Sequence, residues 1–252
     1  MTPNNHSAPK RLAIVMPAFN ESRVIGETLD SLKLVKLPLN WNVEIVVVDD
    51  GSSDRTYQVA KSKNVAIMSH PFNCGVGIAL RTGFMWALEN KFDAVMQIDA
   101  DGQHPSSEIN ALLVALDSSG ADIVIGSRFL EGKWSTTKLR RLTMSALAKL
   151  VSWGTASRIT DATSGFRVSG PRAISIFAKD YPGEYLGDTV ESLILAHRRG
   201  LRIIEVPANL RERQGGVASH LRIRSSLHVL RVFVMVTLRL SKPKTIFVIE
   251  DD

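Results

Sequence analysis

The sequence predicts an α/β fold in which a mostly parallel sheet is flanked by helices. Through the first half of the chain, short uninterrupted apolar runs alternate with segments of helical periodicity, and this order is typical of parallel strands joined by helices. The apolar runs show no in–out alternation, as expected for strands that are covered on both faces. A length of 252 residues suits one large domain.

The expected elements follow one another without an evident linker. Strands are expected at 12–16, 43–48, 65–68, 94–98 and 123–125, and helices at 21–32, 56–63, 77–90 and 108–116. Pro, Gly, Asp and Ser bound many of these segments, and these residues favour turns. We assign residues 11–215 to the folded domain and the polar residues 1–10 to a flexible tail.

The C-terminal segment, residues 216–252, is basic and amphipathic and is expected to form helices. Its longest apolar run, Val232–Val236, is far shorter than the roughly 20 residues that cross a bilayer. Two interpretations stay open. The segment lies on a membrane surface with its arginines near lipid phosphates, or it packs on the core as an ordinary amphipathic helix.

The composition limits the classes of partner and the compartment. A net charge of +6 favours anionic partners, such as nucleotide phosphates or anionic lipid. The interleaved aromatics and motifs of nucleic-acid binders are missing, so no nucleic-acid partner is expected. Cys74 is the sole cysteine, which rules out an internal disulfide, and the N-terminus lacks the apolar core of a signal peptide. A cytoplasmic location is therefore expected.

Three expected strands end in polar or acidic residues, at 17–21, 49–50 and 99–101. In a parallel sheet such ends meet at one edge, where ligands bind. If the chain stays extended, Asp99 and Asp101 point to the same side, and a divalent cation would offset their repulsion; oxygen ligands suit Mg²⁺ or Mn²⁺. A solvated turn is the alternative. Asp50 is expected to accept hydrogen bonds from a nucleobase or ribose, or to serve in a turn.

Five motifs occur in the order found in family 2 glycosyltransferases. They are 17–21 (Pro-Ala-Phe-Asn-Glu), 46–54 (Val-Val-Val-Asp-Asp-Gly-Ser-Ser-Asp), 73–77 (Asn-Cys-Gly-Val-Gly), 99–103 (Asp-Ala-Asp-Gly-Gln) and 126–128 (Gly-Ser-Arg). Within that family the chain most resembles the dolichol- and polyprenyl-phosphate sugar transferases, over about residues 10–215. The resemblance implies a GT-A, Rossmann-like fold and inverting transfer of a hexose from a nucleotide diphosphate sugar.

The resemblance also implies a donor site. Its nucleotide-sugar-binding residues would be Pro17, Phe19, Glu21, Val48, Asp50, Asp99, Ala100, Asp101 and Arg213. The ligands of a Mg²⁺ or Mn²⁺ ion would be Asp99, Asp101 and Gln103. Arg213 lies in a segment that resembles a mobile loop closing on the donor diphosphate, although the usual lysine is missing and His220 lies near its place.

The acceptor implied by the resemblance is a polyprenyl phosphate. Arg128, Arg141 and Ser145 match the positions that hold its phosphate, and Arg141 and Ser145 would share a helix face. An ionised phosphate needs no base, so Asp188 would be catalytic only if the acceptor is a hydroxyl. The alternative acceptor is thus a hydroxyl of a lipid-linked saccharide or a cell-envelope glycan precursor.

Access to lipid is expected at the inner face of the cell membrane, through the basic C-terminal segment or a membrane-protein partner. Two further classes are alternatives: a nucleotide- or nucleic-acid-binding module without catalysis, and a nucleotidyltransferase, whose glycine-rich N-terminal phosphate loop is not seen. The sequence leaves open the donor nucleotide (UDP, GDP or dTDP), the sugar and the number of subunits.

Overall fold

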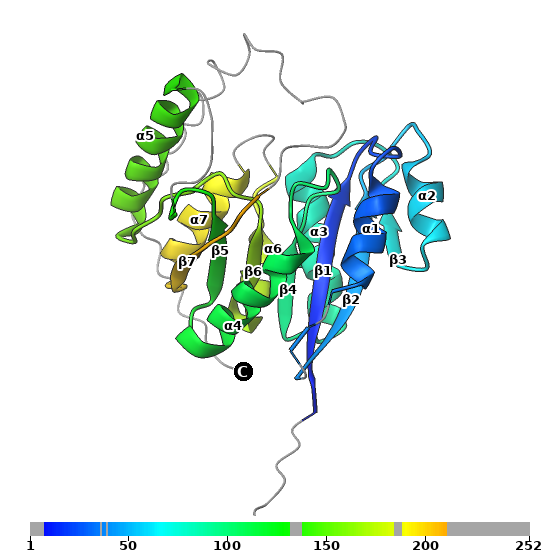
Figure 1. The fold of residues 1–252 in the computed structure, drawn as a ribbon, viewed down its shortest axis with the longest axis horizontal. Helices are drawn as coiled ribbons and strands as arrows, with labels where there is room; N and C mark the ends of the chain where they lie inside the picture. The colour runs from blue at the N-terminus through cyan, green and yellow to red at the C-terminus, as the bar shows by residue number, and fades with distance from the viewer. Residues whose placement is uncertain (1–7, 36, 39, 132–137, 184–187, 211–252) are drawn as a thin grey trace, which may run out of the picture.

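The computed structural model describes residues 8–35, 37–38, 40–131, 138–183 and 188–210. Its strands form one sheet in the order β3-β2-β1-β4-β6-β5-β7 (Figure 1). The strands are β1 (Lys10–Ala18), β2 (Trp41–Asp49), β3 (Ala66–Ser69), β4 (Ala94–Gln97), β5 (Ile123–Ser127), β6 (Arg167–Ser169) and β7 (Ile203–Pro207). All pairings are parallel except those of β6, which runs antiparallel to β4 and β5. The predicted mostly parallel sheet is confirmed.

Helices cover both faces of this sheet (Figure 1). They are α1 (Ile25–Lys33), α2 (Thr56–Ser62), α3 (Val76–Glu89), α4 (Ile109–Ser119), α5 (Lys138–Thr155), α6 (Pro171–Asp180) and α7 (Asp188–Arg198), with a short 3-10 turn η1 (Ser106–Glu108). Residues of α3, α5, α6 and α7 pack into one apolar core, and residues of α1, α2 and α4 pack into the other.

The two cores explain the uninterrupted apolar run of β1. Successive side chains of a strand point to opposite faces. Ala13 and Val15 enter the core beneath α3 and α6, and Leu12, Ile14 and Met16 enter the core beneath α1 and α4. Because both faces are covered, every position of the run has to be apolar, which is why alternation is missing from the sequence.

Close packing of α3 against the sheet requires a glycine. A Cβ atom at Gly83 would lie 2.2 Å from Val15 Cγ1, inside van der Waals contact. At the start of the same helix, a Cβ atom at Gly77 would lie 2.1 Å from the carbonyl oxygen of Pro182. Any larger side chain at either position would push the helix off its neighbours.

One expected helix begins later than predicted. The segment 21–32 was expected to be helical from Glu21, but α1 begins at Ile25. The backbone N–H of Glu21 donates to Thr56 Oγ1 at 2.8 Å, and that of Ser22 donates to Asp54 Oδ2 at 3.2 Å. These bonds tie residues 21–22 to the loop after β2 and to the start of α2, so the chain enters α1 only after a turn.

The second half of the sheet contains two strands that the sequence did not predict, β6 and β7. β6 inserts between β4 and β5, with Arg167 level with Gln97 on one side and Ile125 on the other. A three-residue strand is too short to show periodicity. Because β6 runs in reverse, its first residue lies at the edge where the parallel strands end.

No helix in the described parts of the chain is long and apolar enough to cross a membrane. The predicted C-terminal segment 216–252, Arg213 and the domain boundary at residue 215 lie outside the described residues.

Candidate active site at the carboxyl edge of the sheet

The carboxylate of Asp50, just after β2, is buried and heavily bonded. Its Oδ1 accepts the backbone N–H of Cys74 at 3.0 Å and lies 2.7 Å from His70 Nδ1. Its Oδ2 accepts the backbone N–H of Gly75 at 2.7 Å. An ionised carboxylate offers about four acceptor positions, so these contacts leave about one for a ligand. Asp50 therefore anchors the loop that leads into α3.

Asp50, His70 and Cys74 also have potential metal-ligand atoms within 4.8 Å of one another. The second ring nitrogen of His70, Nε2, lies 3.0 Å from Thr82 Oγ1. Hydrogen bonds thus account for both nitrogens of the ring and for its contact with Asp50. We assign this group a structural role, which is to fix His70 and the Asp50 carboxylate against α3.

The loop after β1 is tied to the loop after β2. Asn20 has a positive φ of 55°, and its Oδ1 accepts the backbone N–H of Ser53 at 2.9 Å. Phe19, beside it, is 44% exposed. Pro17 and Val48 are paired in register on neighbouring strands and are buried. Among these predicted nucleoside-pocket residues, Phe19 thus offers an open aromatic face.

The loop after β4 carries the predicted metal ligands. β4 ends at Gln97, and residues 100–101 form a turn, so the extended geometry that would have put Asp99 and Asp101 on one side is not kept. Asp101 Oδ1 instead accepts the backbone N–H of Gln103 at 3.1 Å, which closes a tight turn. The Asp99 side chain is 37% exposed, and Asp101 is 9% exposed.

His104 supports this loop from inside, a role that its place in the sequence does not indicate. Its Nδ1 accepts the backbone N–H of Asp99 at 3.0 Å. Its ring stacks on Phe166, with centroids 5.0 Å apart. Burial lowers the pKa of His104 to about 4; Asp101 acts in the opposite direction and Arg128 adds to the lowering. The ring is therefore neutral near pH 7.

Arg128, predicted to hold an acceptor phosphate, forms an ion pair in this structure. Its Nε and Nη2 donate to the two oxygens of Asp161, each at 2.7 Å, and Nη2 also donates to Thr163 Oγ1 at 2.8 Å. Asp161 is held in turn by Glu205 of β7, which accepts the Asp161 backbone N–H at 2.9 Å. A phosphate at Arg128 would share the guanidinium with Asp161.

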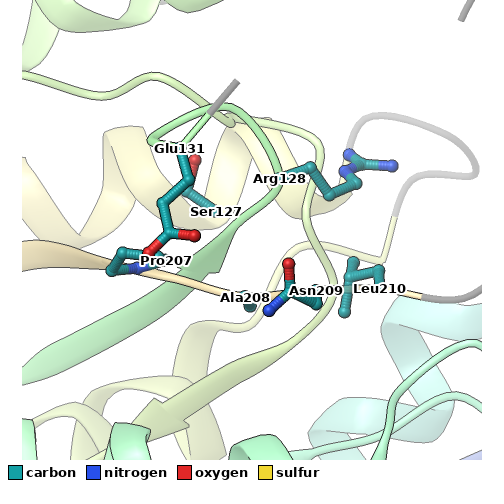
Figure 2. A pocket seen from close by; sticks show the side chains of 7 residues that line it. All are labelled: Ser127, Arg128, Glu131, Pro207, Ala208, Asn209 and Leu210. Carbon is teal, nitrogen blue, oxygen red and sulfur yellow. The ribbon is translucent and has the colours of Figure 1, made fainter. Parts of the chain in front are cut away.

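A shallow cleft of about 70 Å³ adjoins Arg128 (Figure 2). It is lined by Ser127, Arg128, Glu131, Pro207, Ala208, Asn209 and Leu210. Figure 2 shows Glu131 over Pro207, with the Arg128 side chain extending to the other side. Ligand pockets for drug-sized molecules have volumes of roughly 300 Å³ or more, so this cleft does not hold a whole nucleotide sugar.

Asp188 begins α7 and is 5% exposed. Burial raises its pKa to about 6; Arg167 and the Thr189 backbone N–H oppose the rise, and Asp99 adds to it. The Arg167 guanidinium is buried and donates to the carbonyl oxygens of Ser164 at 2.7 Å and Thr189 at 2.9 Å. Arg167 therefore joins the segment before β6 to the first turn of α7. Arg167 ends the segment 161–167, which resembles a family segment that shapes the floor of the site, but the resemblance did not predict these contacts.

Arg141 and Ser145 lie on α5, as predicted, and both are exposed. Residues four apart share a helix face, so the structure confirms the helix on which the predicted pairing depends. A phosphate contact there stays a prediction.

Comparisons with known proteins agree with this architecture. Residues 13–175 match the Glycosyl transferase family 2 profile. An uncharacterized protein of Methanocaldococcus jannaschii is 34% identical over 77% of this chain and 79% of its own. The undecaprenyl-phosphate mannosyltransferase of Micrococcus luteus is 30% identical over 82% of this chain and 86% of its own.

A solved structure shares the fold. The glucosyl-3-phosphoglycerate synthase of Mycobacterium tuberculosis, crystallised with Mn²⁺, UDP and phosphoglyceric acid, has a TM-score of 0.70 at 20% identity, over 94% of this chain and 80% of that one. The GT-A fold and the enzyme class predicted from the motifs are confirmed. The chain belongs to glycosyl transferase family 2.

Proposed function

We propose that this glycosyltransferase transfers a hexose, with inversion, from a nucleotide diphosphate sugar to a polyprenyl phosphate. The observation that carries the acceptor class is the likeness to the Micrococcus luteus enzyme, which is named for transfer to undecaprenyl phosphate and matches over most of both chains. The acid-bearing loop after β4 supports the donor class, because it lies at the edge where open α/β sheets bind ligands.

The residues of that loop fit a divalent cation. Asp99, Asp101 and Gln103 supply only oxygen ligands, which are the ligands that Mg²⁺ and Mn²⁺ prefer. A Cβ atom at Gly165 would lie 3.1 Å from Asp99 Oδ2, so the glycine leaves room beside this carboxylate. When bound, the cation neutralises negative charge on the departing nucleoside diphosphate.

The donor nucleoside would lie between the loops after β1 and β2. Phe19 offers a face on which a base can stack, and Asp50 retains about one acceptor position for a base N–H or a ribose hydroxyl. Pro17, Glu21, Val48 and Ala100 complete the proposed pocket. Arg213, outside the described residues, would meet the diphosphate.

The acceptor phosphate would be held by Arg128, Arg141 and Ser145. Guanidinium groups bind phosphate through paired, charge-assisted hydrogen bonds. Asp161 would share the Arg128 guanidinium with the phosphate, and Arg141 would add a second guanidinium. The enzyme would work at the inner face of the membrane, bound peripherally through residues 216–252 or through a membrane-protein partner.

A hydroxyl acceptor is the second candidate, and Asp188 favours it. A general base works best when its pKa is near the working pH, and burial has moved the pKa of Asp188 to about 6. With a hydroxyl acceptor, Asp188→Asn abolishes transfer. With a phosphate acceptor, Asp188→Asn causes a mild loss and Arg141→Ala causes the greater one.

The test is a donor screen with purified protein. UDP-, GDP- and dTDP-sugars are supplied with Mn²⁺ and a short polyprenyl phosphate, and products are identified by mass. We expect a glycosyl phosphate lipid together with a nucleoside diphosphate. Pyrophosphate release would indicate a nucleotidyltransferase. Transfer only to lipid-linked saccharides would replace the first candidate with the second.

A further inference from the structure

The loop that bears the proposed cation ligands is closed at its base by one side chain. The backbone N–H of Asp99 donates to Nδ1 of His104 at 3.0 Å. This bond joins the first residue of the turn to its sixth and spans both Asp101 and Gln103. The His104 side chain is only 3% exposed, so water does not compete readily for either partner.

The bond fixes the tautomer of the ring. Because Nδ1 accepts the Asp99 N–H, it carries a lone pair, and the ring proton has to reside on Nε2. Nε2 lies 3.8 Å from Asp99 Oδ2, beyond hydrogen-bond distance. His104 thus holds the main chain of Asp99 and does not hydrogen-bond its carboxylate.

The ring is held in place by a second contact. It stacks on Phe166 with a centroid distance of 5.0 Å and an interplanar angle of 24°. Phe166 is fully buried, and its carbonyl oxygen accepts the backbone N–H of Gly126 at 2.8 Å. His104 and Phe166 therefore connect the loop after β4 to β5.

We propose that His104 is the positioning residue of the divalent-cation site, with Nδ1 setting the backbone of Asp99 so that the loop presents its oxygen ligands from one fixed turn. The inference rests on the proposed binding of Mg²⁺ or Mn²⁺ by Asp99 and Asp101. Outer-shell partners of metal ligands act in this way, by limiting the geometries that the ligands adopt.

The first test needs neither metal nor substrate. Protein labelled with ¹⁵N-histidine is examined by long-range ¹H–¹⁵N correlation, which distinguishes the two neutral tautomers and the cation. We expect the histidine signal that disappears in His104→Asn to be in the Nε2–H form at neutral pH. Assignment of His104 to the Nδ1–H form would overturn the proposal.

The second test separates the acceptor from the ring. His104→Phe keeps an aromatic ring on Phe166 and removes the acceptor. His104→Asn removes the ring, but its Oδ1 occupies nearly the position of Nδ1. We measure the dissociation constant of Mn²⁺ alone from the free-ion signal in electron paramagnetic resonance. A 10–100-fold weakening is expected for His104→Phe, with most of the affinity recovered in His104→Asn.

The order of the two variants in Mn²⁺ affinity distinguishes a positioning role from general damage to the fold. If His104 only filled the core, His104→Asn would bind Mn²⁺ more weakly than His104→Phe, because it loses the larger apolar contact. That order, or equal affinity of both variants and the parent, would refute the positioning role. If the parent protein itself binds no Mn²⁺ while the tautomer is as expected, it is the proposed cation site that fails.

Discussion

Two strand ends at the same edge carry paired aspartates, yet their surroundings differ. After β2, the Asp50 side chain is 4% exposed, and its oxygens are engaged by two backbone N–H groups and His70. After β4, the Asp99 side chain is 37% exposed, and Asp101 is bonded within its own turn. The Asp50 carboxylate holds the structure together, whereas Asp99 is exposed at the surface and Asp101 is buried beneath it at 9% exposure.

The cause lies in what packs over each end. The loop leading into α3 folds back over the end of β2 and donates its N–H groups to Asp50. Beside Asp99, after the end of β4, lies Gly165, which has no side chain to cover the Asp99 carboxylate. Similar local sequences, an apolar strand followed by aspartates, therefore acquire different roles from distant parts of the chain.

The largest effect on the rate of transfer should come from removing the charge of Asp101, in the loop after β4. Asp101→Asn keeps the oxygen that accepts the Gln103 N–H but loses the negative charge that a cation needs. We expect transfer to fall by about 10²–10³-fold, the range for loss of one electrostatic contact to the transition state, with the melting temperature little changed. Initial rates across a Mn²⁺ titration measure this loss.

A marked fall in melting temperature for Asp101→Asn would contradict the comparison. It would mean that this carboxylate also stabilises the fold.

Asp50, in the loop after β2, should instead affect the stability of the fold. Asp50→Asn replaces one acceptor oxygen with an N–H₂ group facing donors, so at least one bond to a charged acceptor is lost in a dry environment. We expect the free energy of unfolding to fall by about 3 kcal/mol. Urea denaturation at pH 7 measures it, and Asp30→Asn, the same change at an exposed carboxylate of α1, is the matched control.

Unchanged stability in Asp50→Asn would show that the loop into α3 holds without its carboxylate anchor.

The same contrast shows how far the sequence could predict the molecule. The elements of the first half were predictable, because apolar runs and helical periodicity are local signals. The register of Asp50 with the loop at 72–75 was not, since a pattern of turn formers does not say which backbone N–H groups a carboxylate will meet. The motif order predicted the family, but not that Asp161 would pair with Arg128.

Arg167 and His104 mark the limit of sequence reasoning at the site. Arg167 reaches the ligand edge only because the three-residue β6 runs antiparallel, and so short a strand has no periodicity to detect. His104 follows Gln103 directly and resembles any polar loop residue; its burial arises from Phe166, more than 60 residues later. Both residues act through long-range contacts.

Asp188 is a third acid at this edge, and burial changes its pKa. Its pKa is raised to about 6, mainly by burial, against about 3.9 in an unfolded chain. Between these values the folded protein binds more protons than the unfolded chain. The free energy of unfolding therefore decreases as pH rises from about 4 to about 6, by about 2 kcal/mol.

Asp188→Asn should remove this decrease, because an amide does not ionise. Denaturant titrations of both proteins at pH 4, 5, 6 and 7 measure the difference. Parallel curves for the parent and the variant would show that Asp188 ionises without penalty in the folded state.

The smallest effect on stability is expected at an exposed arginine of α5. Arg141 is exposed on α5, so Arg141→Ala should leave the free energy of unfolding within about 0.5 kcal/mol of the parent. If it binds an acceptor phosphate, the KM for polyprenyl phosphate should rise about tenfold, equivalent to about 1.4 kcal/mol, while the KM for the nucleotide sugar stays constant.

Arg128→Ala is the informative partner variant: it leaves Asp161 as a buried carboxylate without its ion pair, so it should reduce stability as well as acceptor binding. If Arg141→Ala instead changed only the KM for the nucleotide sugar, α5 would belong to the donor side of the site, and the division between a donor site on the first strands and an acceptor site beyond β5 would have to be redrawn.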